Sequence, residues 1–235
     1  MNPSTQSHLL QVCRTCGGGA PVDVHFCPSC TRILTLGRQG DYFSFLGLPR
    51  KLNLDAAHVE RQFRALSRQF HPDFFYNASP AERRASLERS SYLNDAYRTL
   101  KQPATRVAYL LEVEGALQPS DHDVAKKVPA SLLEEVFALN EELDEVRDLR
   151  SGGAPEAEWR ARLSAAAAPI EAKRAEHEAQ LASLSERWDA LDDGDVQGRA
   201  TVLAALRERV LERNYINNLL ATIEREATGA GRPQL

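Results

Sequence analysis

The chain has 235 residues, of which 43% are hydrophobic and 26% are charged, and its formal net charge is −4. This length and composition favour two or three folded domains and exclude wholesale disorder. The acidic balance argues against a nucleic-acid partner, and no apolar run approaches the roughly 18 residues that a membrane-spanning helix needs.

The charge is distributed unevenly along the chain. Residues 1–40 carry three basic and one acidic side chain, residues 41–114 carry eleven and nine, and residues 115–235 carry fifteen and twenty-three. A weakly basic front and an acidic back predict separate modules with different partners. No apolar signal-peptide core and no Arg or Lys precede Arg14, so we expect a cytoplasmic protein.

The four cysteines all lie near the N-terminus, in two Cys-x-x-Cys pairs formed by Cys13, Cys16, Cys27 and Cys30. Two such pairs can place four thiolates around one tetrahedral metal ion. A segment of about 35 residues cannot bury enough surface to fold alone, and a structural metal can fix its fold. Zinc is favoured over iron, and a redox role is disfavoured because no βαβ pattern surrounds either pair.

The sequence between the two cysteine pairs also predicts a short strand and the position of a histidine. The alternation of Val22, Val24 and Phe26 predicts a short strand leading into the second pair. His25 lies close to Cys27, but four cysteines already complete a metal site. We therefore expect His25 on the surface.

The middle of the chain predicts a helix over about residues 55–70. Its apolar side chains recur at helical spacing and are Val59, Phe63, Leu66 and Phe70. A different face carries three arginines, Arg61, Arg64 and Arg68. Because Pro72 disfavours helical backbone at the residue before it, the helix should end near Phe70.

A second helix should begin after a short loop. Ser79, Pro80 and Glu82 form the pattern of an N-terminal capping box. The apolar face of this helix would be formed by Leu93, Ala96, Tyr97 and Leu100. The two helices then make an antiparallel hairpin with the His-Pro-Asp loop (residues 71–73) at its tip.

Residues 41–111 resemble a J domain, the module by which co-chaperones engage heat-shock chaperones of the seventy-kilodalton class. The resemblance includes the opening segment 41–48, the basic helix, His71-Pro72-Asp73 and the segment 94–100, in the expected order. It implies that the chain is not an enzyme itself but stimulates ATP hydrolysis on the partner chaperone. The implied chaperone-binding residues are His71, Pro72, Asp73, Arg61, Arg64 and Arg68.

The rest of the chain predicts three helices, over about 129–150, 155–191 and 195–227, with turns at residues 151–153 and 192–194. Short polar turns between amphipathic helices favour an antiparallel three-helix bundle. Pro169 should kink or split the second helix. His177 lies on an apolar stripe and is expected to be packed or at its rim rather than to bind a ligand.

The segment 103–111, followed by an acidic helical region with no Gly/Phe-rich linker, is similar to the HscB-type co-chaperones of iron–sulfur cluster assembly. The resemblance implies a DnaK/HscA-type chaperone and the cluster scaffold protein IscU as partners. The implied scaffold-binding residues are Leu133, Phe137, Glu141, Leu143 and Tyr215. Ala138 and Asn140 depart from the family pattern. From the residues alone, Leu133 and Phe137 fit either a wide core face or an exposed patch.

The expected fold is all-α: a J-domain hairpin and a three-helix bundle, preceded by a zinc-ribbon or rubredoxin-like knuckle module. The expected domains are residues 1–38, 41–114 and 124–228. One alternative is a J-domain adaptor for a different client, and another is a thiol enzyme or a zinc-ribbon nucleic-acid binder. The cysteine module could stabilise the J domain, mediate self-association or contact a partner.

Overall fold

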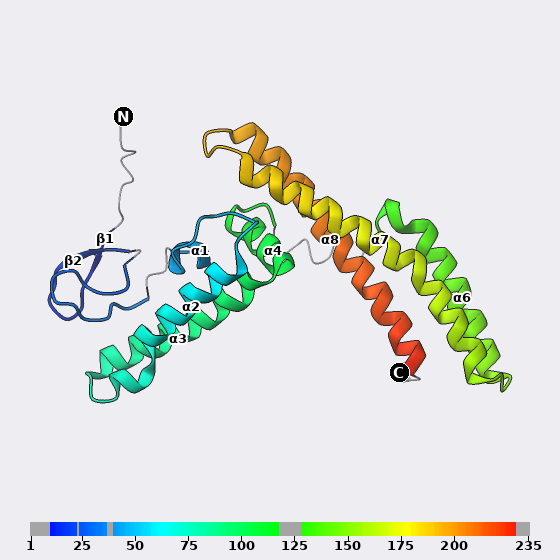
Figure 1. Cartoon of the computed structure of the whole chain (residues 1–235), viewed down its shortest axis with the longest axis horizontal. Helices are drawn as coiled ribbons and strands as arrows, with labels where there is room; N and C mark the ends of the chain where they lie inside the picture. The colour runs from blue at the N-terminus through cyan, green and yellow to red at the C-terminus, as the bar shows by residue number, and fades with distance from the viewer. Residues whose placement is uncertain (1–9, 23, 37–39, 118–127, 229–235) are drawn as a thin grey trace. The chain divides into compact units, whose positions relative to one another are not determined.

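The computed structural model describes residues 10–22, 24–36, 40–117 and 128–228. The chain divides into two compact units, Met1–Val113 and Glu114–Leu235. Within the described residues there are seven α-helices and one two-stranded sheet, which confirms the all-α expectation (Figure 1). Residues 1–9, 23, 37–38 and 124–127 of the expected domains lie outside the described residues.

The sheet of the first unit lies beside the first cysteine pair. Strands β1 (Leu10–Val12) and β2 (Gly19–Pro21) are antiparallel, and Leu10 lies opposite Pro21. The expected strand through Val22, Val24 and Phe26 is wrong for the described residues, since there only Phe26 forms a β-bridge, with Ile33. The strands instead flank the first knuckle because the chain reverses there and brings segments 10–12 and 19–21 side by side.

Four helices complete the first unit: α1 (Tyr42–Phe45), α2 (Ala56–Phe70), α3 (Pro80–Lys101) and α4 (Pro103–Val113). Helices α2 and α3 form the expected antiparallel hairpin (Figure 1). Asp55 caps α2 by accepting a hydrogen bond from the Ala57 N–H, and Ser79 and Glu82 form the capping box of α3. The expected apolar stripes face each other, and the rings of Phe63 and Tyr97 stack at 4.2 Å.

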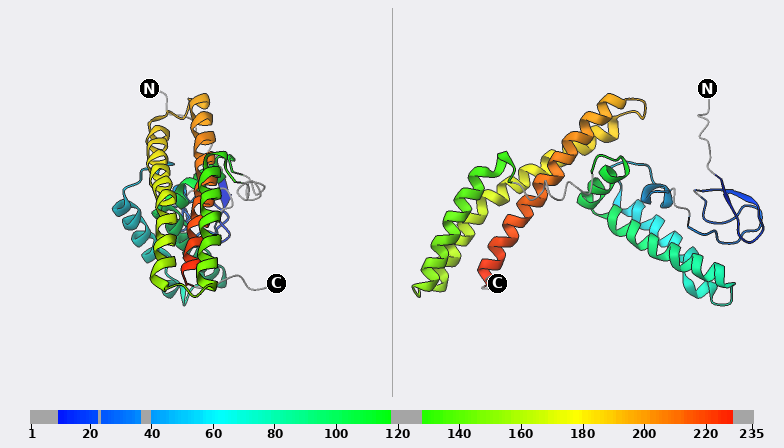
Figure 2. Two further views of the ribbon diagram at one scale, coloured as in Figure 1. Left: turned by 90° about the vertical axis from the view of Figure 1, so that its right-hand side faces the viewer. Right: turned by 180° about the vertical axis from the view of Figure 1, so that it is seen from behind.

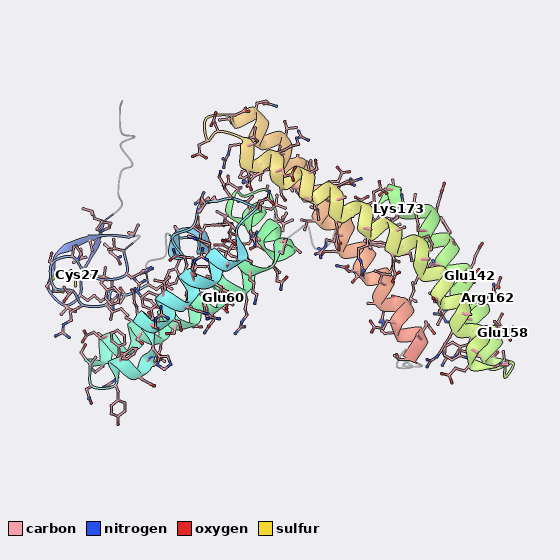
Figure 3. All side chains as sticks on the ribbon, in the orientation of Figure 1. Cys27, Glu60, Glu142, Glu158, Arg162 and Lys173 are labelled. Atoms are coloured by element: carbon pink, nitrogen blue, oxygen red, sulfur yellow. The ribbon has the colours of Figure 1, made fainter. Side chains whose placement is uncertain are left out.

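The second unit contains the 3₁₀ turn η2 (Ala130–Leu132) and the helices α6 (Leu133–Ser151), α7 (Glu156–Ala190) and α8 (Val196–Thr228). Helix α7 packs along both α6 and α8 (Figure 2). Their shared core is formed by Leu132, Leu139, Leu143, Val146, Trp159, Leu163, Ile170, Ile216 and Ile223. At the rim, Arg162 pairs with Glu142 across α7 and α6 at 3.1 Å (Figure 3). The expected three-helix bundle is confirmed.

Pro169 does not split α7, which runs continuously over 35 residues. Proline removes one backbone hydrogen bond at this exposed position, whereas Leu163 and Ile170 on either side are each 2% exposed. Burial of one helix face outweighs the loss of a single backbone bond. None of the helices in the described ranges combines the length and apolarity needed to span a bilayer.

Candidate functional site

The four cysteines of the N-terminal module come together in the structure. Their sulfur atoms all lie within 4.8 Å of one another, and the Cys13–Cys30 and Cys16–Cys27 sulfur pairs are 3.7 Å apart. Cys13 and Cys27 are buried, whereas Cys16 is exposed and Cys30 is half-buried. The four-cysteine cluster is therefore enclosed by protein at Cys13 and Cys27 and open to solvent at Cys16. Cys27 is labelled in Figure 3.

The two knuckles share one backbone pattern. In the first, the Gly17 N–H donates to the Cys13 carbonyl and the Cys13 N–H donates to the Gly18 carbonyl, both at 2.8 Å. In the second, the Thr31 N–H donates to the Cys27 carbonyl at 2.8 Å, and the Cys27 N–H donates to the Arg32 carbonyl at 2.9 Å. Each knuckle is closed by a residue in the left-handed region, Gly17 at φ +76° and Thr31 at φ +58°. The sequence thus builds two equivalent turns that present paired thiols.

The backbone around these knuckles also favours thiolates. The N–H groups of Cys16 and Thr15 point at the Cys13 sulfur and lower the pKa of Cys13 to about 6. Burial raises the pKa of Cys27, but the Cys30 and Ser29 N–H groups lower it by more. The Arg32 N–H lowers the pKa of Cys30, yet burial and the neighbouring sulfurs raise it to about 12. Four sulfurs this close cannot all ionise without a cation between them.

These residues fit a metal ion with four thiolate ligands. The donor set is all sulfur and tetrahedral in number, as in structural zinc sites and single-iron sites. The module buries only a small apolar core, formed by Cys13, Ala20, Cys27 and Leu34. A bound metal would cross-link the two knuckles and supply the stability that so small a core lacks.

The His-Pro-Asp loop lies at the tip of the α2–α3 hairpin. Helix α2 ends at Phe70 as expected, because His71 turns to ψ 127°, and the 3₁₀ turn η1 (Pro72–Phe75) follows. The Asp73 N–H donates to Nδ1 of His71 at 3.3 Å, which leaves Nε2 to carry the proton of the neutral ring. The side chains of His71 and Asp73 are 52% and 86% exposed, so both are available to a partner.

The arginine face of α2 is exposed at all three expected positions. Arg61 lies 3.5 Å from Asp55, and Arg64 lies 2.5 Å from Glu60. Exposed ion pairs of this kind contribute little to stability, so these arginines can exchange their carboxylate neighbours for those of a partner. The structure brings this face and the His-Pro-Asp loop onto one helix and the turn that follows it.

The end of α2 is held by α3. The hydroxyls of Ser86 and Ser90 both donate to the Phe70 carbonyl, at 2.6 and 3.0 Å. Phe70 is fully buried, and its ring lies against the rings of His25 and Phe26 of the cysteine module. The residue that precedes the His-Pro-Asp loop is therefore packed from two sides.

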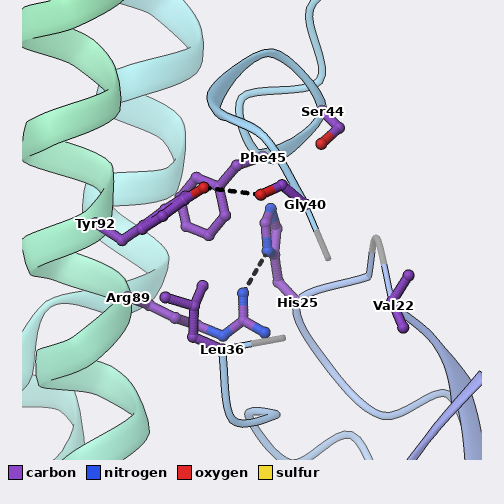
Figure 4. A pocket seen from close by; sticks show the side chains of 8 residues that line it. All are labelled: Val22, His25, Leu36, Gly40, Ser44, Phe45, Arg89 and Tyr92. Atoms are coloured by element: carbon purple, nitrogen blue, oxygen red, sulfur yellow. Dashed lines mark hydrogen bonds between the residues drawn. The ribbon is translucent and has the colours of Figure 1, made fainter. Parts of the chain in front are cut away.

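The expectation that His25 lies on the surface is wrong. His25 is half-buried, and its ring packs edge-on against Phe45 and Phe70, with centroids 4.8 and 4.9 Å apart. Arg89 of α3 donates to His25 Nδ1 at 2.8 Å (Figure 4). Sequence reasoning missed Arg89 because a lone arginine on a helix is usually solvated, and its partners lie more than fifty residues away.

The candidate residues of the second unit separate into surface and core. Leu133 and Phe137 of α6 are 42% and 68% exposed, and Glu141 on the next turn is exposed. We call these three residues the α6 patch. Leu143 is only 3% exposed and belongs to the bundle core, so its expected place on a contact surface is corrected. Tyr215 of α8 is half-buried against the same core.

A buried polar network in the bundle had no signal in the sequence pattern. His177, as expected, is packed: it is 5% exposed, and its Nε2 lies 2.6 Å from Glu212. Glu212 also accepts a hydrogen bond from Ser131 and lies 2.7 Å from Arg209. The network joins η2, α7 and α8 beneath the start of α6.

Comparisons with known proteins agree with this geometry. The DnaJ domain family model matches residues 41–109. A co-chaperone protein HscB homolog of Bordetella petrii is 39% identical over 149 residues, which cover 63% of this chain and 81% of the relative. The iron–sulfur cluster co-chaperone protein HscB of Homo sapiens is 28% identical over 201 residues, covering 84% and 80%.

Two solved structures are similar over most of the chain. The crystal structure of human co-chaperone protein HscB aligns with a TM-score of 0.67 and 26% identity, covering 92% of this chain and 98% of the other. Chaperone HscB from Vibrio cholerae aligns with a TM-score of 0.59 and 29% identity, covering 81% and 99%.

Proposed function

Because the chain belongs to the HscB family of co-chaperones, we propose that it serves iron–sulfur cluster assembly by coupling a cluster scaffold protein to a chaperone of the seventy-kilodalton class. The chaperone is of the DnaK/HscA type, and the scaffold is of the IscU type. In this account residues 41–114 dock on the chaperone and stimulate its ATP hydrolysis, and residues 124–228 hold the scaffold. The chain has no catalytic role of its own.

The exposed His-Pro-Asp loop is the observation that carries the proposal. The Asp73 carboxylate is 86% exposed and can accept charge-assisted hydrogen bonds from an arginine of the chaperone. His71 presents a ring N–H beside it, and Pro72 restricts the backbone between them. The arginines at positions 61, 64 and 68 attract an acidic surface and increase the rate of encounter.

The α6 patch is the proposed scaffold-binding surface. Leu133 and Phe137 offer apolar area, and Glu141 offers charge at the rim, which is the usual anatomy of a protein interface. Tyr215 lies half-buried at the adjoining helix and is proposed as a marginal contact. Leu143 supports the patch from the core and makes no contact with the scaffold.

The cysteine module is proposed to hold a structural zinc ion and to stabilise the J domain. Arg32 pairs with Glu82 of the α3 capping box at 3.0 Å, and His25 packs on Phe70. These contacts support a stabilising role over self-association, because they use the module's surface within one chain.

Steady-state ATP hydrolysis by the cognate chaperone tests the proposal. We expect the wild-type chain to increase hydrolysis, and the scaffold protein to increase it further in a synergistic manner. Stimulation that is indifferent to the scaffold would leave the J-domain role and favour an adaptor for another client. No stimulation at any concentration would contradict the proposal.

A further inference from the structure

Two aromatic side chains stand in solvent directly beside the His-Pro-Asp loop. Phe74 and Tyr76 are 73% and 78% exposed. Among the described residues, the only other large aromatic side chain that is mostly exposed is Phe137 of the α6 patch, at 68%. Single exposed apolar residues are ordinary, but two aromatic rings within three residues, next to a docking loop, are an apolar surface.

The backbone holds this aromatic pair in place. The Phe74 N–H donates to the His71 carbonyl at 3.0 Å, within the turn η1. The ring of Phe74 lies edge-on to His71 with centroids 6.1 Å apart. After the turn, Arg83 of α3 donates to the carbonyls of Tyr76 and Ala78 at 3.4 and 3.1 Å. A partner would therefore bind rings whose backbone is already ordered, which reduces the entropic cost of binding.

We propose that Phe74 and Tyr76 form an apolar anchor that belongs to the same docking surface as the His-Pro-Asp loop. The inference rests on the proposed function and extends it. The occupant is the ATP-bound chaperone, and its complementary surface is an apolar pocket with acidic side chains on the side that meets the arginine face.

The shape of the surface favours this occupant. The pair is continuous with His71 and has basic side chains near it, the α2 arginines at one side and Arg83 of α3 beside Tyr76. The charged part would govern encounter and its salt dependence, while buried aromatic rings would slow dissociation. Aromatic side chains are among the residue types enriched at the buried centres of protein interfaces.

Binding to the ATP-bound chaperone at several salt concentrations tests the proposal. We expect Phe74→Ala and Tyr76→Ala each to weaken affinity by about tenfold or more at every salt concentration, because burying an aromatic ring contributes at least that factor. The salt dependence should keep its wild-type slope. Arg64→Ala should instead reduce the slope, since it removes a charge.

Matched controls separate this effect from a general one. Val196 at the start of α8 is 76% exposed, so Val196→Ala removes exposed apolar area elsewhere and should leave the affinity unchanged. Tyr76→Phe keeps the ring and should retain most of the affinity. Both anchor variants should keep the wild-type circular dichroism spectrum and melting temperature, since neither side chain is buried.

Three results would overturn the proposal. Wild-type affinity in the double variant Phe74→Ala/Tyr76→Ala would exclude the anchor while leaving the J-domain function intact. A wild-type chain that neither binds nor stimulates the chaperone would instead show that the proposed function fails. If the wild-type chain sediments as a dimer and the double variant as a monomer, while the affinity for the chaperone is unchanged, the surface would instead bind a second copy of the chain.

Discussion

Arg89 and His25, 64 residues apart in the chain, are joined by a 2.8 Å hydrogen bond from the guanidinium to the imidazole Nδ1. Arg89 is only 2% exposed and also donates to the carbonyls of Leu34 and Thr35, at 2.7 and 3.2 Å. Burial lowers the pKa of Arg89 to about 10, so the side chain keeps its charge at neutral pH. One buried cation thus connects the cysteine module to the middle of α3.

Replacement of this cation should destabilise the first unit. We expect Arg89→Met to lower the free energy of unfolding by about 2–4 kcal/mol, because two carbonyls and His25 lose their donor in a buried place. Urea unfolding of the full chain measures the change. Arg84→Met on the exposed face of α3 is the control, and an equal effect of both variants would contradict a specific role for Arg89.

Removal of the proposed metal ion should destabilise the cysteine module without affecting the bundle. A strong chelator, or Cys27→Ser, leaves the two knuckles without their cross-link, and only a small core connects them. We expect the melting temperature of the first unit to fall by about 5 °C or more, since a loss of 1 kcal/mol of stability shifts the melting temperature of a small domain by about that amount. Metal analysis and calorimetry of the same samples check the result. An unchanged transition in a metal-free sample would contradict the stabilising role.

The α6 patch and the bundle core should respond differently to truncation. Phe137→Ala should cost less than about 1 kcal/mol of stability, because the ring is 68% exposed, and should weaken scaffold binding. Leu143→Ala should cost about 2–5 kcal/mol, because Leu143 is 3% exposed in the core. Urea unfolding and binding titrations of both variants decide the matter. A large stability loss in Phe137→Ala would place the ring in the core.

The network around Glu212 should make bundle stability depend on pH. Burial raises the pKa of the Glu212 carboxyl, but hydrogen bonds from Ser131 and His177 and the charge of Arg209 lower it by more. A carboxyl with a lowered folded-state pKa stabilises the fold above its ordinary pKa, and the effect is lost as pH falls through the lowered value.

We therefore expect the stability advantage of the wild type over Glu212→Gln to be largest near neutral pH and to shrink as the pH falls from the ordinary carboxyl pKa of 4.5 through the lowered value. Urea unfolding over this range measures it. Glu224→Gln, at an exposed position of the same helix, is the control. A difference between wild type and Glu212→Gln that stays constant with pH would contradict the assignment.

Local signals made much of the fold predictable. The helix stop at Pro72, the capping box at Ser79 and the apolar stripes of α2 and α3 are all encoded within a few residues of where they act. The spacing of the four cysteines likewise predicted a shared site, and the structure brings their sulfurs close enough together to hold a metal ion.

The features that escaped prediction depend on distant partners. His25 was expected on the surface and Arg89 carried no expectation, because their contact joins segments that are 64 residues apart in the chain. Leu143 looked like part of a contact surface because its place was carried over from a resemblance, whereas helix packing decides which side chains face the core. Pro169 stayed within α7 because burial on both sides of it outweighed local propensity.

We propose that the chain uses two separate surfaces, one for the chaperone and one for the scaffold. The most direct measurement is chaperone ATP hydrolysis against scaffold concentration, with His71→Gln and Leu133→Ala/Phe137→Ala compared with the wild type. We expect His71→Gln to bind the scaffold without stimulating ATP hydrolysis, and the double variant to keep basal stimulation but to lose the scaffold-dependent increase. Loss of both activities in either variant, with its fold intact, would contradict the separation.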